Sequence, residues 1–281
     1  MAGLSTKAIK NRIKSMNSTR QITTAMELVA ASKLRGAQAK AVAVKEYFTT
    51  FYEAMQDIAS SSSDFESKFL LDTPCENPLY IVIAGDRGLA GGYNNNVFRM
   101  TIGMPANAKV IPIGKRSVDH FAKRNFEIVT KDYIEAASLT TDDCYSIADI
   151  AAEGFLKGEF DSVYIIYTNF INLLSQETER LMLLPISLEK KEGPKAQKVL
   201  YEPSAEAVFN RIVPEYLGGL IFGALCKSIA SEQASRRQAM NSATKNADEI
   251  IAELDLQYNR ARQGAITQEI TEIVAGSNAQ S

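Results

Sequence analysis

The chain has 281 residues, of which 46% are hydrophobic and 23% are charged, and its formal net charge at pH 7 is -2. This balance is ordinary for a folded protein of one or two domains and excludes a chain too polar to form a core. No run approaches 18 consecutive apolar residues, and residues 1–7 lack the apolar core of a signal peptide. We therefore expect a cytosolic chain that does not insert into a membrane.

The three cysteines are Cys75, Cys144 and Cys226, and His120 is the only histidine. The cysteines are odd in number, widely separated and without a CxxC pair. The sequence therefore predicts neither a disulfide framework nor a metal site.

All eight prolines lie between Pro74 and Pro214, so the two ends of the chain lack the residue that most reliably breaks a helix. Neither end can bury a wide apolar face alone, so we expect two long helices that pair with each other. The predicted organisation is a helix in residues 1–73, an α/β domain in 74–204 and a second helix in 205–281. The predicted fold class is α/β, with a long antiparallel coiled coil and a small Rossmann-like domain.

The first predicted helix covers about 54 residues from Leu4 to Asp57, or about 80 Å at 1.5 Å per residue. Farther along this helix, apolar residues alternate at spacings of four and three over four heptads. This seam consists of Ala30, Leu34, Ala37, Ala41, Val44, Phe48, Phe51, Met55 and Ile58. Upstream, Arg20 and Thr23 stand where apolar residues would continue the pattern. The pairing there is expected to be looser or to face something else.

Residues 1–40 are strongly basic, since only Glu27 opposes eight basic side chains: Lys7, Lys10, Arg12, Lys14, Arg20, Lys33, Arg35 and Lys40. A solvated face, a nucleic-acid surface and a surface for an acidic protein sleeve are all compatible with this charge. Nucleic acid is the least favoured partner, because these residues include no aromatic side chain that could stack on bases.

The middle of the chain alternates predicted strands and helices, which is typical of a small parallel sheet. Strands are expected at residues 79–84, 109–113 and 162–167, and helices at 94–100, 118–124 and 146–156. Residues 173–175 and 180–185, with a polar connection at 176–179, predict a terminal hairpin.

A glycine-rich segment, residues 85–92, follows the first predicted strand. Backbone amides at such a helix start can hold phosphate. The spacing of these glycines matches neither GxGxxG nor GxxxxGK[ST], so a tight turn with positive φ and close packing is the other interpretation. His120 has no Ser or Cys nucleophile motif near it and is expected to pack on the surface or a helix. No catalytic residues and no cofactor are predicted.

The last helix is expected to begin near Ala205, after Pro203 and Ser204, and Pro214 is expected to kink or restart it. Its predicted seam is rich in alanine, which favours close approach of the two helix axes. The predicted seam residues are Phe209, Val213, Tyr216, Leu220, Leu225, Ile229, Ala243, Ala247, Ile250 and Leu254. Beyond Tyr258 the apolar stripe continues along one side to the helix tip.

Four segments carry a resemblance to a known family. They are Ile22–Lys33 (ITTAMELVAASK), Gly85–Gly92 (GDRGLAGG), Ser231–Arg236 (SEQASR) and Tyr258–Glu269 (YNRARQGAITQE). Together, in this order, they closely resemble the gamma subunit of F-type ATP synthase from end to end.

This resemblance implies a non-catalytic rotor shaft that couples ion flow through a membrane ring to ATP synthesis or hydrolysis at the beta subunits. The implied partners are three alpha and three beta subunits, an epsilon subunit and the membrane c ring. The implied location is the cytoplasmic face of the bacterial inner membrane. No nucleic acid, cofactor or small-molecule substrate is implied.

The resemblance also assigns residues. Met26 matches a methionine beside the beta loops, and Arg262 and Gln263 match a pair that hydrogen-bonds to a beta loop. Arg236, Thr267 and Glu269 match neighbours in that coupling region, and Glu202 matches a position near the c ring. Three of these have simpler interpretations: Met26 as seam packing, Arg262 as the partner of acidic neighbours in its own helix, and Glu202 as an acid at a helix start.

Some features depart from the family pattern. Ser277 follows Gly276 where the family has alanine, which affects only the terminal contact. The chain has neither the inserted dithiol segment of chloroplast relatives nor a transit peptide, which favours a bacterial enzyme. Two other functions stay open: a nucleotide-binding enzyme whose helices dimerise it, and a coiled-coil adaptor with no motor role.

Overall fold

The computed structural model describes residues 6–60, 65–70, 76–187 and 201–278, with the side chains of 44–48 and 276–278 outside the description. Cys75 therefore lies outside the described part, as do the side chains of Ser277 and of the seam residues Val44 and Phe48. The chain divides into two compact units. The first unit combines residues 1–30 with 237–281, and the second comprises residues 31–236.

The two longest helices lie toward the two ends of the chain. Helix α1 (Thr6–Ser60) has 55 residues and helix α5 (Ala205–Asn278) has 74, in agreement with the lengths expected from the proline-free ends. The Ser204 hydroxyl accepts a hydrogen bond from the Ala207 N–H at 3.1 Å and so caps the start of α5. Helix α5 does not restart at Pro214, because the buried Val213 and Leu217 hold the helix in the core on both sides of the proline.

The two helices pair antiparallel inside each unit. In the second unit, Leu34 and Ala37 of α1 pack against Ala230 and Ala234 of α5. Farther toward Ser60, the rings of Tyr52 and Tyr216 lie 6.2 Å apart. The contacting residue of α5 thus moves back along the chain as that of α1 moves forward, which confirms the predicted antiparallel coiled coil.

The predicted seams are largely buried. Ala30, Leu34, Ala37, Met55 and Ile58 of α1 all lie in the core. In α5 one prediction is wrong, because Ile250 is 40% exposed. The buried positions nearby are Ala247 and Leu254, one heptad apart, which leave Ile250 on the outer side of the pair.

The α/β domain in the second unit is built on a five-stranded sheet with the order β3-β2-β1-β4-β5. Strands β1 to β4 are parallel, and β5 is an antiparallel edge strand beside β4. The strands are β1 (Pro78–Ile83), β2 (Lys109–Ile113), β3 (Glu127–Ile128), β4 (Ser162–Phe170) and β5 (Gln176–Leu184). The other elements are the short 3-10 helix η1 (Lys68–Leu70) and the helices α2 (Tyr93–Met100), α3 (Lys115–Phe121) and α4 (Thr141–Lys157).

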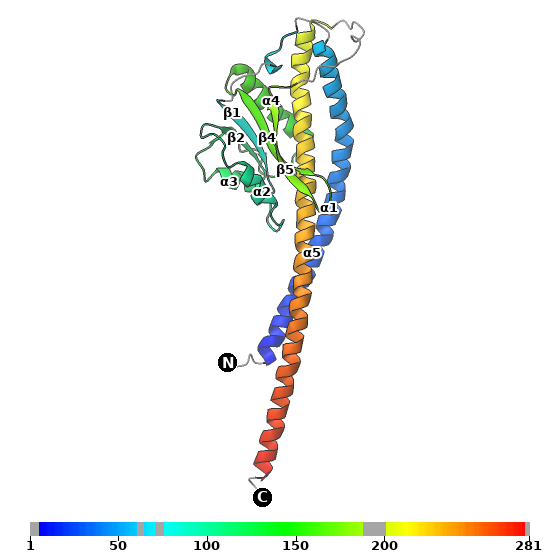
Figure 1. Ribbon diagram of the computed structural model, residues 1–281, viewed down its shortest axis with the longest axis vertical. Coiled ribbons are helices and arrows are strands. Elements are labelled where there is room, and N and C mark those ends of the chain that lie inside the picture. The colour runs from blue at the N-terminus through cyan, green and yellow to red at the C-terminus, as the bar shows by residue number, and fades with distance from the viewer. Residues whose placement is uncertain (1–5, 61–64, 71–75, 188–200, 279–281) are drawn as a thin grey trace. The chain divides into compact units, whose positions relative to one another are not determined.

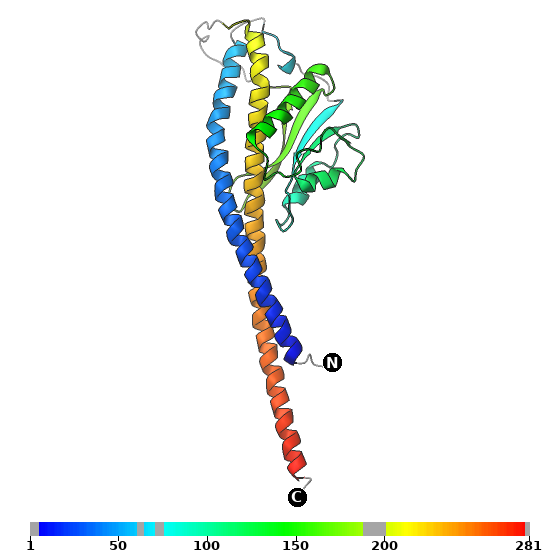
Figure 2. The same ribbon diagram turned by 180° about the vertical axis from the view of Figure 1, so that it is seen from behind.

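The sheet is covered on both faces, which explains why every residue of β1 is apolar or buried. On one face, Leu79, Ile81 and Ile83 pack with residues of α4, α5 and α1. On the other face, Tyr80 and Val82 pack with Val97 of α2 and Phe121 of α3. Figures 1 and 2 show α4 on the side of the sheet that faces α5.

The predicted hairpin exists, but its first strand is β4. Residues 173–175 form the turn instead of a strand, because the Asn172 carboxamide oxygen accepts hydrogen bonds from the N–H groups of Leu174 and Ser175, both at 2.9 Å. The polar segment 176–179, predicted as a connection, is the first part of β5. Its side chains are tolerated there because β5 is an edge strand.

One stretch of α5 between Ala205 and Ala275 is long and apolar enough to cross a membrane by length and composition alone. Half of that window is buried inside the protein. The buried Phe209, Val213, Leu217 and Ile221 account for this apolar character, because they contribute to the core of the second unit.

Two glycines in the long helices are expected to respond in opposite ways to alanine. A Cβ at the exposed Gly36 would meet nothing within 4 Å, so Gly36→Ala should stabilise the protein by about 0.5–1 kcal/mol. A Cβ at Gly218 would lie 2.1 Å from Cδ1 of Tyr145, so Gly218→Ala should destabilise it by about 1–3 kcal/mol. Denaturant unfolding of both variants measures this, and equal shifts of the two midpoints would contradict the close packing of α4 on α5.

Candidate functional site

The glycine loop, residues 85–92, follows β1 at the carboxyl edge of the parallel strands. The Gly85 N–H donates to the Asn94 side-chain oxygen of α2 at 2.9 Å, and the Gly85 carbonyl accepts from the Arg116 N–H of α3 at 3.0 Å. In this loop Leu89 and Gly91 have positive φ angles of 61° and 56°. The turn interpretation therefore holds for Gly91, while Leu89 takes the conformation expected of a glycine.

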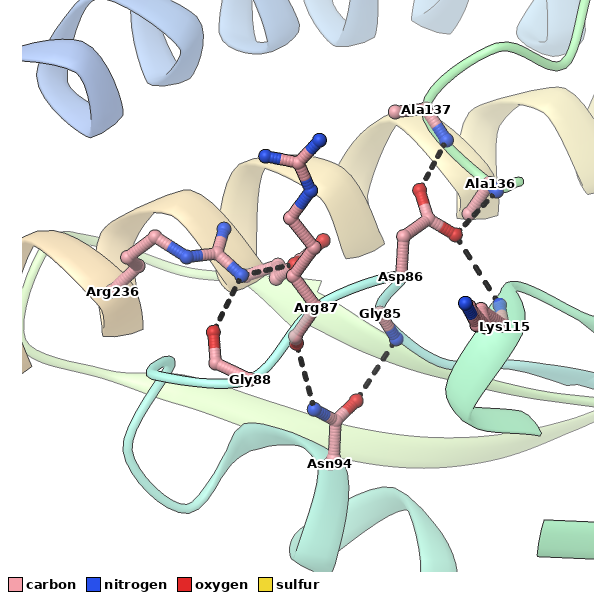
Figure 3. Close-up of polar contacts among 10 residues, drawn as sticks. Gly85, Asp86, Arg87, Gly88, Asn94, Lys115, Ala136, Ala137 and Arg236 are labelled. Atoms are coloured by element: carbon pink, nitrogen blue, oxygen red, sulfur yellow. Dashed lines mark hydrogen bonds and ion pairs between the residues drawn. The ribbon is translucent and has the colours of Figure 1, made fainter. Parts of the chain in front are cut away.

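The Asp86 carboxylate of the glycine loop binds three backbone amides that lie outside the loop. It accepts hydrogen bonds from the N–H groups of Lys115 at 3.3 Å, Ala136 at 2.8 Å and Ala137 at 3.0 Å (Figure 3). Lys115 is the first residue of α3, where an anion would otherwise bind. The protein thus supplies its own anion at this helix start.

Helix α5 fills the other side of the loop. A Cβ added to Gly85 would lie 2.9 Å from Cδ and Oε1 of Glu232, so a larger residue at this position would have to displace that carboxylate. One Arg236 Nη donates to the Glu232 carboxylate at 2.5 Å and to the Gly88 carbonyl at 3.2 Å (Figure 3). Burial raises the pKa of the Glu232 carboxyl, while Arg236 acts in the opposite direction.

This arrangement does not suit a nucleotide. A phosphate placed at the loop would be near the carboxylates of Asp86 and Glu232, and the Gly85 N–H is already bonded to Asn94. The glycine loop therefore joins α5 to the sheet.

In the first unit, four of the predicted partner-binding residues lie on the last turns of α5. Arg262, Gln263, Thr267 and Glu269 are all exposed. The Thr267 hydroxyl donates to the Gln263 carbonyl of its own helix at 2.9 Å. Within the described residues, Arg262 forms no ion pair with the acidic neighbours that its simpler interpretation requires.

The other predicted residues lie elsewhere. Met26 is half-buried on α1, in agreement with partial packing in the helix pair. Glu202 is exposed just before the cap of α5. Arg236 differs from the rest, because its side chain is only 11% exposed and turned toward the glycine loop.

The sequence irregularity at Arg20 and Thr23 has a structural explanation. The hydroxyls of Thr23 and Thr244 form a hydrogen bond of 2.7 Å between the two helices of the first unit. Arg20 lies 3.2 Å from the Asp248 carboxylate. These residues therefore face α5. We call these contacts between α1 and α5 the polar crossing. The sequence analysis missed it, because its only sign in the sequence is that polar residues of two distant segments occupy facing positions along the helix pair.

Glu27, the only acid among residues 1–40, extends this crossing. Its carboxylate lies 3.4 Å from the Asn241 side-chain nitrogen and 4.0 Å from the Arg237 guanidinium. Its negative charge is thus matched inside the helix pair, while Lys7, Lys10, Arg12 and Lys14 stay exposed.

The remaining chemical groups are structural. Cys144 and Cys226 are free and buried, and burial raises the pKa of both thiols. The His120 ring stacks on Phe98 with centroids 3.9 Å apart, as the packing interpretation expects. Across the part of the chain that the structure describes, no group of three or more His, Cys, Asp or Glu side chains could hold a metal ion.

Comparison with known proteins identifies the family. The sequence matches the family model described as ATP synthase over residues 5–280. It is 43% identical over 278 residues to the ATP synthase gamma chain of Ruminococcus albus, with 96% of this chain and 97% of that one covered. The chain belongs to the ATP synthase gamma-chain family. The resemblance drawn from the four sequence segments is thus confirmed.

Other gamma chains support the same assignment. The gamma chain of Acetobacterium woodii, named as sodium ion specific, is 39% identical, with 96% of this chain and 97% of that one covered. Among solved structures, a chain of the mitochondrial ATP synthase of Euglena gracilis superposes with a TM-score of 0.64 at 17% identity, covering 98% and 94% of the two chains. A central-stalk chain from Tetrahymena thermophila gives 0.60 at 22% identity, covering 79% and 99%. These two structures share the fold.

A gamma chain is a non-catalytic part of the central stalk, and catalysis takes place in the beta subunits. The alternative of a nucleotide-binding enzyme is therefore wrong, and so is that of an adaptor outside the motor. The blocked glycine loop gives a physical reason for the first conclusion.

The isolated gamma chain is expected to bind no nucleotide at the glycine loop, because the carboxylates of Asp86 and Glu232 place negative charge in and beside the loop. Titration calorimetry with Mg-ATP should give no saturable heat up to about 1 mM. The Asp86→Asn variant should behave in the same way, since α5 still fills the loop. Micromolar binding by the unmodified chain would contradict this interpretation.

His120 should make stability depend on acid pH. Burial, with help from Arg124, lowers the pKa of His120 to about 4, and its Nε2 is buried without a partner among the described residues. The reference pKa of histidine is about 6.5, so this stability is present above about pH 6.5 and is lost as pH falls toward 4. Compared with the native chain, His120→Phe should lose less thermal stability between pH 7 and pH 5. Equal losses in the two proteins would rule out this role for His120.

Proposed function

We propose that this gamma chain turns as the central rotor shaft of an ATP synthase. In this proposal, residues 1–73 and 205–281 form the shaft inside a ring of three alpha and three beta subunits. Residues 74–204 form the α/β domain, which contacts the epsilon subunit and the membrane c ring. The enzyme would lie on the cytoplasmic face of a bacterial inner membrane.

The observation that carries this proposal is the exposed end of α5. In the first unit α5 continues past the start of α1 (Figures 1 and 2), and every residue from 262 to 275 is exposed. The apolar Ile266, Ile270 and Ile273 on this end are 44%, 57% and 66% exposed. An uncovered apolar stripe of this kind favours a protein partner.

The charged surface of α1 supports the same kind of partner. Lys7, Lys10, Arg12 and Lys14 are exposed, and so are the apolar Ile22, Leu28 and Val29 farther along the helix. Such a surface suits a surrounding ring of subunits that presents acidic loops to the basic side chains and apolar residues to the others. We propose that the beta subunits present these groups.

The proposed mechanism is coupling by differential contact. A helix pair whose exposed side chains differ around its circumference touches each beta subunit differently at each angle. Each orientation then favours one beta conformer, and rotation moves the three sites through different nucleotide affinities. Met26, Arg262, Gln263, Thr267 and Glu269 are the proposed contacts, and all are exposed or half-buried.

Two predicted residues stand apart from this set. Glu202 is proposed to face the c ring, and its exposure leaves it available. Arg236 is proposed at the same coupling region, but the glycine loop takes most of its side chain. We therefore expect Arg236 to act mainly by holding α5 against the glycine loop, and less by touching a beta subunit.

Reconstitution tests the role of the whole chain. Alpha and beta subunits should hydrolyse ATP with full cooperativity only when this chain is present, because the shaft sets the states of the three sites. Affinity purification of the tagged chain from membranes should also recover alpha, beta, epsilon and c subunits. Full cooperative hydrolysis without this chain would refute the rotor role.

The variant Arg262→Ala/Gln263→Ala tests the proposed beta contacts. Both side chains are exposed, so the fold should be unaffected. Loss of charge-assisted hydrogen bonds worth about 2 kcal/mol should lower coupled turnover by about tenfold or more. Ion-driven ATP synthesis in membrane vesicles measures this.

The matched control is Lys123→Ala, an exposed residue in the α/β domain outside the proposed contacts. It should synthesise ATP at the native rate. If the double variant also does so, Arg262 and Gln263 do not make the contacts assigned to them.

A further inference from the structure

Strand β4 extends beyond its neighbour β1. The paired residues of these strands run from Pro78 and Ser162 to Val82 and Ile166. Strand β1 ends at Ile83, whereas β4 continues to Phe170 with β5 on its other side. The backbone of β4 after Ile166 therefore needs other partners on the side that β1 leaves open.

Helix α5 supplies these partners. The Ser228 hydroxyl accepts a hydrogen bond from the Thr168 N–H at 3.0 Å. The Ser231 hydroxyl donates to the Thr168 carbonyl at 3.1 Å. Both serines are completely buried, and they lie one turn apart on α5. Two side chains of a helix thus complete the hydrogen bonding of one strand residue.

The next turn of α5 continues the same face. Arg236 donates to the Gly88 carbonyl of the glycine loop and to Glu232. The Ser235 hydroxyl donates to the Gln176 carboxamide oxygen of β5 at 3.0 Å. We call the five residues the polar stripe: Ser228, Ser231, Glu232, Ser235 and Arg236. Their spacing of three and four places them on one side of the helix.

The polar stripe differs from the earlier part of α5. There, Phe209, Val213, Leu217 and Ile221 pack against the sheet through apolar contacts. Apolar contact resists separation but is not directional. Hydrogen bonds weaken steeply when their angles change, so the stripe resists rotation and sliding of α5 against the sheet.

We propose that the polar stripe is a rotational lock between α5 and the α/β domain. It holds three places on the domain at once: Thr168 of β4, Gly88 of the glycine loop and Gln176 of β5. Torque that enters at the domain then reaches the helix without slip. This inference rests on the proposed rotor function, and Arg236 acts in it as a positioning residue.

The test compares two double variants in the assembled complex of alpha, beta and this chain. Ser228→Ala/Ser231→Ala removes both hydrogen bonds to Thr168. Ser138→Ala/Ser146→Ala is the matched control, because those hydroxyls bond to carbonyls of their own segments, Glu135 and Asp142. A bead attached to the domain at Lys123→Cys, in a Cys75→Ser background, reports its angle during rotation driven by ATP.

The lock predicts a wider spread of bead angles during each pause for Ser228→Ala/Ser231→Ala than for the control, with the unloaded ATPase rate unchanged. A purely structural contribution would lower thermal stability without changing this spread. If both variants rotate with the same spread, the lock is refuted. If the native chain does not rotate at all, the proposed rotor function fails instead.

A milder set of variants covers the case in which loss of both buried serines prevents folding. Ser235 is half-buried, and its hydroxyl donates to Gln176. Ser235→Ala, Gln176→Ala and the combined variant therefore form a double-mutant cycle. The lock predicts that each single change widens the spread and that the combined change adds little. No widening in any of the three would refute the lock as well.

Discussion

The packing of α5 against the sheet is the contact on which the α/β domain depends. Its apolar residues Phe209, Val213, Leu217 and Ile221 close one face of the sheet and carry the helix through Pro214. The following two turns are polar and fill the side of β4 that β1 leaves open. Without α5, part of one sheet face would be exposed, and the Thr168 backbone would lose the Ser228 and Ser231 hydroxyls that bond to it. The helix is therefore part of the domain core as well as half of the helix pair.

The glycine loop shows how a parallel sheet can keep the outline of a nucleotide-binding fold without its chemistry. The loop follows β1 at the position where such folds hold phosphate. Here Asp86 takes the amides at the start of α3, and the Glu232–Arg236 pair takes the space beside Gly85. Asp86 and the Glu232–Arg236 pair belong to the same chain as the loop, so they occupy this position in every molecule. This suits a non-catalytic subunit whose partners carry out the chemistry.

The first unit combines a polar crossing with an uncovered end. The Thr23–Thr244 contact, together with Asp248 beside Arg20, specifies which levels of the two helices meet. An exposed ion pair adds little stability, but a buried polar contact disfavours other alignments, since a shifted helix would lose the hydrogen bond between Thr23 and Thr244. Beyond this crossing, α5 loses its partner helix and its side chains are exposed from Arg262 to Ala275. The surface proposed to meet other subunits thus starts where the pairing inside the chain ends.

The sequence by itself determined the long helices, most of the strands and the family. Proline-free ends, seams at spacings of three and four, and short β-branched runs are local signals, and the four matching segments identify a gamma chain without coordinates. It also placed Arg262, Gln263, Thr267 and Glu269 on one helix end, but whether they touch a beta subunit depends on chains outside this one. Only the tertiary structure decided that Arg236 faces the glycine loop, that Arg20 and Thr23 meet α5, and that β4 is the first strand of the hairpin. The first two outcomes depend on polar groups that meet across more than a hundred residues, and hydrogen bonds between distant segments leave no periodic signal in a single sequence. The hairpin depends on the local turn at Asn172 and on the pairing of a polar segment as an edge strand.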